Sequence, residues 1–204
     1  DETLGAGGFL YDAVRCKAKV YVVLMTNGDG FTLAADREFR TLRATSRRFI
    51  ELGYIRQRES LEALKILGVP KENVFFLGYP DKGLARMWHE HWAAFSPYLS
   101  KFTKTYESPY FNSYRPYTLY SGEDGIKDLE DIILKVRPTI ILTAAPVDMH
   151  PDHWATYNFT LYAIEDLDQK GTLLAPKPQV LWYLVHRGEW PYPKGFRPNA
   201  ELFP

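Results

Sequence analysis

The chain of 204 residues carries 25 lysines and arginines against 25 aspartates and glutamates, so its formal net charge is zero. This balance excludes the strong basic field of a protein that binds nucleic acid or an anionic membrane, and a small-molecule partner is expected instead. With 46% hydrophobic residues, the chain is expected to bury one well-packed core, and we predict one domain over residues 1–204.

The one cysteine, Cys16, excludes an internal disulfide and a cysteine-rich zinc site. As a single small apolar side chain, it is expected to be buried. The longest apolar runs, VYVVLM and TIILTAA, are much shorter than the roughly 18 residues of a membrane span. We therefore expect a cytoplasmic protein with no membrane span in this chain, and the sequence leaves open whether it forms a homo-oligomer.

The first half of the chain alternates helical and strand patterns. Residues 3–14 predict a helix whose glycines would allow it to lie close against a sheet. Residues 18–25 are β-branched and continuously apolar, and the turn sequence TNGDG closes them, which predicts a buried strand. Residues 41–67 carry apolar side chains at helical spacing and end before Gly68 and Pro70. The sequence NVFFLGYPD then repeats the pattern of a strand followed by a turn.

The second half continues this alternation after an aromatic-rich, irregular segment at about 82–121, which is long for a connection and predicts an insertion or lid. A helix at about 124–135 leads into the apolar strand PTIILTAAP, and Pro151 suits the first turn of the next helix. The sequence QVLWYLVH predicts a last strand. The pattern predicts an α/β fold with a three-layer, Rossmann-like, mostly parallel sheet and helices on both faces.

Polar residues follow each of three predicted strands. TNGD, GYPD and DMHPDH stand where the strands end, and ligands of open parallel sheets bind beyond the carboxyl ends of the strands. Asp29 and Asp81 would each either contact a ligand or cap a helix at this edge. Asp1 and Glu2 directly precede a helix, so a strand ending ahead of residue 1 would add them to the same edge.

His150 and His153 are three residues apart in a turn that runs into a helix, so their rings can face the same way. Asp148 and Asp152 stand beside them and could fix the imidazole tautomers. This context favours a metal site over isolated capping or surface histidines. His186 ends the last predicted strand, and we expect a structural histidine there, with a place in the pocket as the alternative.

Two stretches match signatures of a known family. DETLGAGG resembles the end of the H-P-D-D-E-x-x-x-G-x-G signature, and HPDH resembles the second signature, of the PIG-L or LmbE-like zinc-dependent N-acetylglucosaminyl de-N-acetylases. Between them, MTNGDG, the pair Arg56 and Glu59 ahead of ALKILGV, and FFLGYPD follow in that family's order. The resemblance covers residues 1 to about 165 and is weakest over 82–121.

The resemblance implies a metal centre for Zn²⁺ or another divalent metal, with Asp1 and His153 as ligands. A histidine ligand, the aspartate that acts as base and the first strand are expected ahead of residue 1. Three protein ligands leave the open position of a catalytic zinc site. The metal would lower the pKa of its water and polarise an acyl carbonyl, so the implied reaction is hydrolysis of the N-acetyl group of an N-acetylglucosamine-type sugar or conjugate.

The same resemblance implies roles for the neighbouring residues. His150 would stabilise the oxyanion, while Asp152 orients its ring and favours its protonated form. Arg56 stands where the family places a substrate-contacting arginine, and a solvated helix position is the alternative. The remaining expected site residues bind substrate or support the metal ligands: Asp29 and Asp81 for the substrate, and Asp148 and Glu2 for the ligands.

Several alternatives stay open. A catalytically impaired family member that binds a carbohydrate or a partner protein is the main rival, whereas Gly5, Gly7 and Gly8 do not match the G-x-G-x-x-G spacing of a Rossmann nucleotide site. The aromatic residues of the segment 82–121 could stack on sugar rings or fill the core. A basic run is expected to be a solvated face, with recognition of an anionic group as the alternative; it consists of Arg37, Arg40, Arg43, Arg47 and Arg48.

Overall fold

The computed structural model describes residues 2–173, 176–189 and 199. The elements in chain order are α1 (Glu2–Arg15), β1 (Val22–Thr26), α2 (Thr32–Glu38), α3 (Ser46–Ile66), the short 3-10 helix η1 (Lys71–Asn73), β2 (Val74–Tyr79), α4 (Leu84–His89), α5 (Gly122–Val136), β3 (Ile140–Ala144), α6 (Pro151–Gln169) and β4 (Gln179–Tyr183). Strands alternate with helices as predicted, and the α/β class is confirmed.

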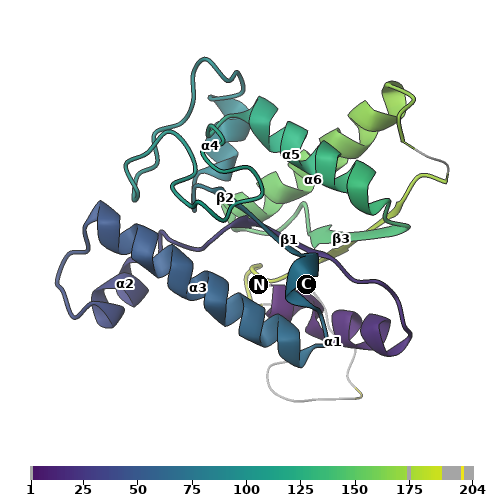
Figure 1. The fold of residues 1–204 in the computed structure, drawn as a ribbon, viewed down its shortest axis with the longest axis horizontal. Coiled ribbons are helices and arrows are strands. Elements are labelled where there is room, and N and C mark those ends of the chain that lie inside the picture. The colour runs from purple at the N-terminus through teal and green to yellow at the C-terminus, as the bar shows by residue number, and fades with distance from the viewer. Residues whose placement is uncertain (1, 174–175, 190–198, 200–204) are drawn as a thin grey trace.

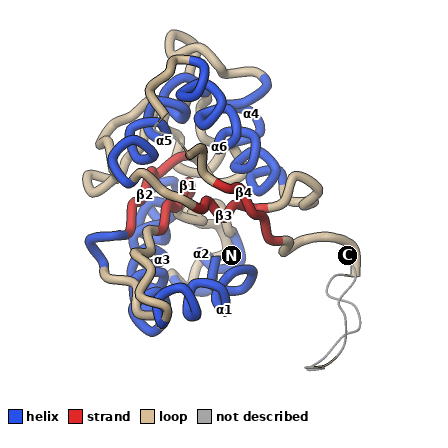
Figure 2. Tube along the Cα trace, turned by 90° about the vertical axis from the view of Figure 1, so that its right-hand side faces the viewer, coloured by secondary structure: helices blue, strands red, loops and turns tan. Residues whose placement is uncertain are grey.

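The strands lie between two layers of helices (Figures 1 and 2). Figure 2 shows α4, α5 and α6 on one side of the strands and α1, α2 and α3 on the other. β1 pairs with β2 in parallel, from Val22 opposite Val74, and β3 pairs with β4 in parallel, from Ile140 opposite Gln179. Within the described residues, no ladder of hydrogen bonds joins β1 to β3, so the sheet consists of two parallel pairs.

The larger core fills the space between the strands and the α4–α6 layer. On α5 the buried residues Ile126, Leu129 and Ile133 recur at helical spacing, because one stripe of this amphipathic helix faces the sheet. They pack with Leu77 and Tyr79 of β2 in the same cluster. Each large apolar side chain buried in this way contributes about 1.5–3 kcal/mol to folding.

The second core lies under the other face of the strands, where α1 packs. Ala6 and Leu10 of α1 are buried in one cluster with Val22 and Leu64. Gly5 permits the close approach that the sequence predicts, because a Cβ at this position would overlap the ring of Tyr183 on β4. The amino-terminal helix is thereby fixed against the last strand.

Two helix starts follow from local sequence. The hydroxyl of Ser121 accepts the N–H of Asp124 at 3.2 Å, which caps α5. α6 begins with His150 as its N-cap and Pro151 in its first turn, where the missing N–H of proline costs nothing. These two features fix where the HPDH segment turns into a helix.

Two details differ from the sequence-based expectations. Cys16 is exposed, because it follows α1 in a surface turn rather than facing a core. The short helices α2 and α4 lie in stretches where no helix is predicted.

Within the described residues, no helix has both the length and the apolar character needed to cross a membrane.

The segment 82–121 is packed onto the rest of the molecule rather than projecting from it. Tyr110 and Tyr120 are fully buried. Tyr114 donates its backbone N–H to the carbonyl of Phe76 on β2, at 2.7 Å. Trp88 and Trp92 form an aromatic cluster with Phe159 of α6 and belong to the main core. Core filling therefore accounts for most of the aromatic residues in this segment.

Candidate active site

The polar residues that follow the strands converge at one edge, as the sequence predicts. The backbone N–H of Gly30, after β1, donates to Oδ2 of Asp81, after β2, at 2.8 Å. The backbone N–H of Lys82 donates to Oδ2 of Asp152, at the start of α6, at 2.5 Å. The loops after β1, β2 and β3 are thus connected by carboxylates at the carboxyl edge of the strands.

Asp148 is a buried carboxylate that organises the histidines. Its Oδ1 accepts the N–H of His150 at 2.9 Å, and its Oδ2 accepts the N–H groups of Val185 and His186 at 3.0 Å each. Its Oδ2 also lies 3.1 Å from Nδ1 of His153. Burial alone would raise the pKa of Asp148, but these hydrogen bonds outweigh it and hold the pKa at about 2. The carboxylate is therefore ionised and fixes the ring of His153.

Three imidazole rings gather beside Asp148. The ring centroids of His150 and His153 are 4.7 Å apart, and His186 lies 5.1 Å from His153 and 5.7 Å from His150. We expected a structural histidine at position 186, with a place in the pocket as the alternative. The ring lies within the histidine cluster, as the alternative has it. The chain after β4, which carries this residue, returns to the same edge as the HPDH segment.

The environment of His150 corrects one expectation. Its Nδ1 accepts the backbone N–H of Asp152 at 3.3 Å, whereas the carboxylate of Asp152 accepts the N–H groups of Lys82 and Leu84. Asp152 therefore orients the His150 ring through its backbone and not through its carboxylate. Burial, followed by the charge of His153, lowers the pKa of His150. The structure thus favours the neutral ring over the protonated form that we expected.

Asp152 and Asp81 form a pair of neighbouring carboxyl groups. Burial raises the pKa of Asp152 to about 7, and the negative charge of Asp81 adds to the rise. The negative charge of the neighbouring Asp81 therefore helps burial to keep a proton on Asp152 near neutral pH.

Arg56 and Asp29 lie beside the turn that follows β1. A Cβ on Gly28 would stand 2.6 Å from Nε of Arg56, so the guanidinium of this α3 residue lies over the glycine backbone. Asp29 is fully buried, and its Oδ2 accepts the hydroxyl of Tyr110 at 2.5 Å. Arg56 therefore reaches the candidate site, while the carboxyl group of Asp29 is directed into the protein.

Two expected site residues cannot be placed in this cluster. Asp1 and the side chain of Glu2 lie outside the described part of the chain. Over residues 2–173, 176–189 and 199, no group of three or more histidine, cysteine or acidic side chains is arranged to hold a metal ion. The described residues supply His153 with its supporting carboxylate, which is the usual arrangement of a histidine that binds a metal.

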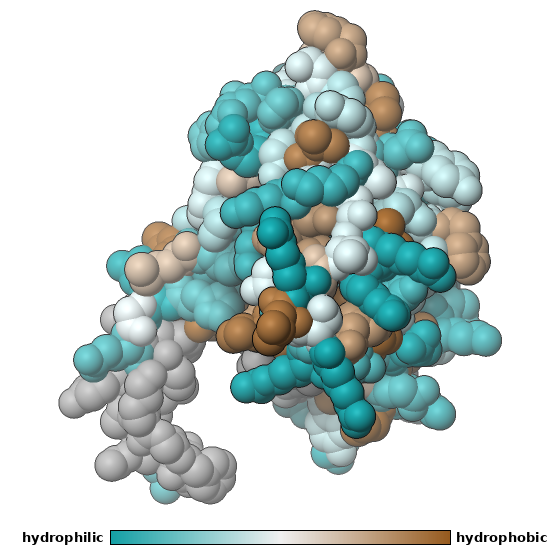
Figure 3. Space-filling model, turned by 90° about the vertical axis from the view of Figure 1, so that its left-hand side faces the viewer, coloured by the Kyte–Doolittle hydropathy of each residue, from teal (hydrophilic) through white to brown (hydrophobic). Residues whose placement is uncertain are grey.

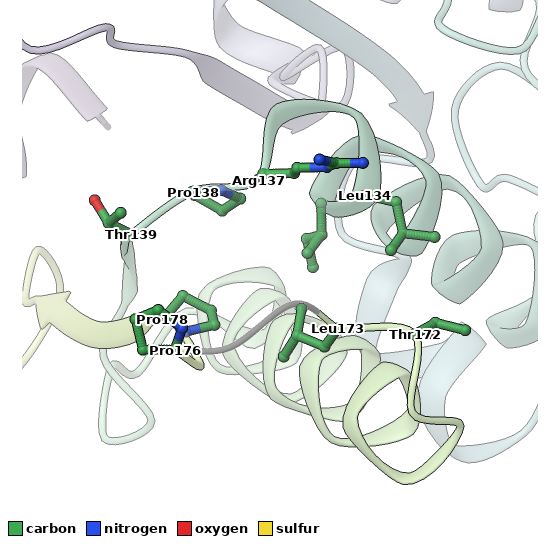
Figure 4. Close-up of a pocket in the computed structure, with 9 residues that line it drawn as sticks. Leu134, Arg137, Pro138, Thr139, Thr172, Leu173, Pro176 and Pro178 are labelled. Atoms are coloured by element: carbon green, nitrogen blue, oxygen red, sulfur yellow. The ribbon is translucent and has the colours of Figure 1, made fainter.

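A cavity lies at the opposite end of the strands (Figure 4). It has a volume of about 470 Å³ and is bounded by Leu134 and Arg137 of the α5 end and by Pro138 and Pro178, which precede β3 and β4. None of the described residues that line it is a histidine or an acid. It therefore lacks the proton-transferring groups that are concentrated at the carboxyl edge.

The arginine run is exposed, on the side of the molecule where α2 lies. Figure 3 shows this side, with hydrophilic side chains between scattered hydrophobic residues. Arg47 and Arg48 both pair with Glu51 at 3.1 and 2.5 Å. These pairs fit the solvated face that the sequence predicts.

The family model described as PIG-L, GlcNAc-PI de-N-acetylase, matches residues 1–164. The chain belongs to this family. The match covers both the amino-terminal signature and HPDH, the two stretches on which the resemblance rests. No sequence among curated proteins matches the chain significantly.

Solved structures support the PIG-L fold. The conserved protein TT1542 from Thermus thermophilus is 20% identical, with a TM-score of 0.56, and the match covers 94% of this chain and 64% of that one. The N,N'-diacetylchitobiose deacetylase from Pyrococcus horikoshii, complexed with its inhibitor MPG, is also 20% identical, with a TM-score of 0.56. That match covers 90% of this chain and 56% of the deacetylase chain. This chain thus spans less than two thirds of either relative.

Proposed function

We propose that this protein is a metal-dependent hydrolase that removes an N-acetyl group from an N-acetylglucosamine-type sugar or conjugate. Membership of the PIG-L family supports the reaction class. The observation that carries the proposal furthest is the contact of 3.1 Å between Asp148 and His153 at the edge where the other polar residues converge. A buried carboxylate that fixes a histidine ring is what a metal-binding histidine requires.

His153 is the proposed metal ligand of the described residues, and Asp1 is proposed as a second. When Nδ1 of His153 donates its proton to Asp148, the lone pair of the ring resides on Nε2, the nitrogen that binds a metal in this tautomer. A zinc ion at such a site lowers the pKa of bound water and polarises an acyl carbonyl.

His150 is proposed to stabilise the negative charge that develops on the acyl oxygen. Since its Nδ1 accepts the N–H of Asp152, the neutral ring carries its proton on Nε2. This N–H can donate a hydrogen bond to an oxyanion without the ring being charged. The proposal therefore agrees with the lowered pKa of His150.

Asp152 is proposed to serve the reaction through the carboxyl pair that it forms with Asp81. A carboxyl group with a pKa of about 7 can hold or release a proton near neutral pH, which suits an acid–base role or donation to a sugar hydroxyl. Its two backbone donors, Lys82 and Leu84, keep the group in place at the beginning of α6.

Arg56 and Asp81 are the proposed substrate-binding groups. They stand on either side of the turn after β1, with Arg56 over Gly28 and Asp81 bonded to Gly30. A guanidinium and a carboxylate can bind several hydroxyl groups of one sugar ring, since one donates and the other accepts hydrogen bonds. Asp29 supports the same turn from inside the protein and, because it is buried, we propose that it acts on the substrate only indirectly.

The test is release of acetate from N-acetylglucosamine and from N,N'-diacetylchitobiose by the full-length protein loaded with zinc. Activity that is lost in His153→Ala and at least about 100-fold lower in His150→Ala supports the proposal, since removal of one oxyanion donor costs about this factor. Arg47→Ala is the control, because this exposed arginine lies away from the edge. Zinc-loaded protein that binds these sugars but releases no acetate would support a catalytically impaired, carbohydrate-binding protein instead.

A further inference from the structure

The turn that follows β1 is the shared support of the two proposed substrate-binding residues. Gly28 has φ = +63°, and its lack of a side chain allows Arg56 to lie against the backbone. Gly30 holds Asp81 through its N–H at 2.8 Å and accepts Nζ of Lys82 at 3.0 Å on its carbonyl. Any shift of this turn would therefore change the separation of Arg56 and Asp81.

One side chain holds the centre of this turn. Asp29 stands between the two glycines and is fully buried, and its Oδ2 accepts the hydroxyl of Tyr110 at 2.5 Å. Since 81 residues separate this pair, the bond fixes the segment 82–121 to the loop after β1. No other residue of that segment is hydrogen-bonded to the Asp29 side chain in the described structure.

Tyr110 is itself held in a fixed position. A Cβ at Gly53 of α3 would overlap its hydroxyl, and a Cβ at Gly78 of β2 would lie 3.2 Å from its Cδ2. The ring of Tyr54 meets it edge-on, with centroids 5.1 Å apart. The ring is completely buried, so it cannot contact a substrate. Gly53 and Gly78 thus leave the space through which Tyr110 reaches Asp29 in the turn after β1.

We propose that Tyr110 is a positioning residue, which acts through Asp29 to fix the Asn27–Gly30 turn and thereby the separation of Arg56 and Asp81. This inference rests on the proposed function for the identity of the two substrate-binding residues. The fixing of the turn itself does not depend on that function, so it has a readout of its own.

The experiment compares Tyr110→Phe with Tyr114→Phe. Both variants remove one tyrosine hydroxyl from the segment 82–121, and Tyr114 donates to Oδ2 of Asp131 at 2.5 Å, away from the turn. The first readout is hydrogen exchange of the Gly30 amide, with the amides of the paired strand β2 as reference. In Tyr110→Phe the Gly30 amide is expected to exchange about tenfold faster than in the wild type or more, as for a turn that has lost one buried hydrogen bond. Tyr114→Phe is expected to leave it unchanged.

The second readout is the division between kcat and KM for acetate release. Tyr110→Phe is expected to raise KM about tenfold and to change kcat by less than about threefold, because binding groups are displaced while the histidine cluster is not. Asp29→Asn keeps an oxygen that accepts the tyrosine hydroxyl, and it should retain the slow exchange of Gly30.

Unchanged Gly30 exchange in Tyr110→Phe would overturn the proposal. Equal acceleration at Gly30 and throughout β2 would also overturn it, since that indicates general destabilisation. If neither the wild type nor any variant releases acetate, the proposed function fails, and the exchange data still decide whether Tyr110 fixes the turn.

Discussion

Oδ2 of Asp148 lies 3.1 Å from Nδ1 of His153, and the same oxygen accepts the backbone N–H groups of Val185 and His186. One buried carboxylate therefore joins the loop after β3, the first turn of α6 and the residues that follow β4. The histidine cluster and the fold around it depend on the same group.

Replacing Asp148 with asparagine should weaken metal binding without removing a proposed ligand. The His153 ring loses the anion that fixes its tautomer, and changes of this kind reduce metal affinity by about 10- to 100-fold. Competition with a chromophoric zinc chelator measures the affinity. Asp166→Asn is the control, since Asp166 pairs with Lys170 at 2.5 Å on the surface. Equal zinc affinity of Asp148→Asn and wild type would contradict the role assigned to Asp148.

A second buried carboxylate, Asp128, supports the main core and not the site. Tyr79 donates to it at 2.7 Å, and Arg115 pairs with it at 2.7 Å. Asp128→Ala should lower the free energy of unfolding by about 3 kcal/mol, because Arg115 and the buried Tyr79 hydroxyl lose their partner. Urea denaturation measures the change. Asp131→Ala, at an exposed position of the same helix, is expected to change the free energy of unfolding by about 1 kcal/mol at most. Similar losses of stability in both variants would contradict the role of Asp128 in the core.

Two helical glycines should respond in opposite directions to alanine. At Gly53 an added methyl group would overlap the hydroxyl of Tyr110, so Gly53→Ala should destabilise the protein by about 1–3 kcal/mol. At Gly8 of α1 nothing lies within 4 Å of the added carbon, so Gly8→Ala should stabilise it by about 0.5–1 kcal/mol through helix propensity. Thermal denaturation of both variants tests the pair, and a stabilising Gly53→Ala would show that Tyr110 is not tightly held.

Asp29 should make the protein less stable as the pH rises. Burial raises its pKa from 3.8 to about 7, so the folded state keeps a proton that the unfolded state releases between these values. The protonated Asp29 contributes its full stabilisation below pH 3.8, the pKa of the group in the unfolded chain. This contribution decreases as the pH rises and is lost at about pH 7, the pKa in the folded protein. Asp29→Asn cannot ionise, so its free energy of unfolding should increase relative to the wild type from pH about 4 to about 7. Parallel stability curves across this range would contradict the raised pKa.

The strands were predictable because their sequences are simple. Each of the four is a short, continuous apolar run that a turn or a polar sequence follows, and such runs are typical of strands buried on both faces. Helix α2 was missed because it has only seven residues, follows directly after the site turn and has no side-chain cap. Its local signal is too weak to distinguish it from a loop.

The candidate site was predictable in its location but not in its pairings. The carboxyl-edge rule brings Asp81, Asp152 and His150 to one place from their order along the chain. It cannot specify that the Asp152 carboxylate selects Lys82 and Leu84, 70 and 68 residues away, over the adjacent His150. Those partners follow from the three-dimensional path of the loop after β2. His186 joins the cluster for the same reason, and its position at the end of a predicted strand was the only signal.

The measurement that tests the account most directly is the zinc content of full-length protein after dialysis against metal-free buffer. We predict about one zinc ion per chain for the wild type and for His89→Ala, and about a tenth of that or less for His153→Ala, because His153 is a proposed metal ligand whose loss would remove tight binding. His89 is the control, since its ring packs against Trp154 and not in the histidine cluster. A wild type that keeps no metal when refolded with zinc, or a His153→Ala variant that keeps as much as the wild type, would contradict the account.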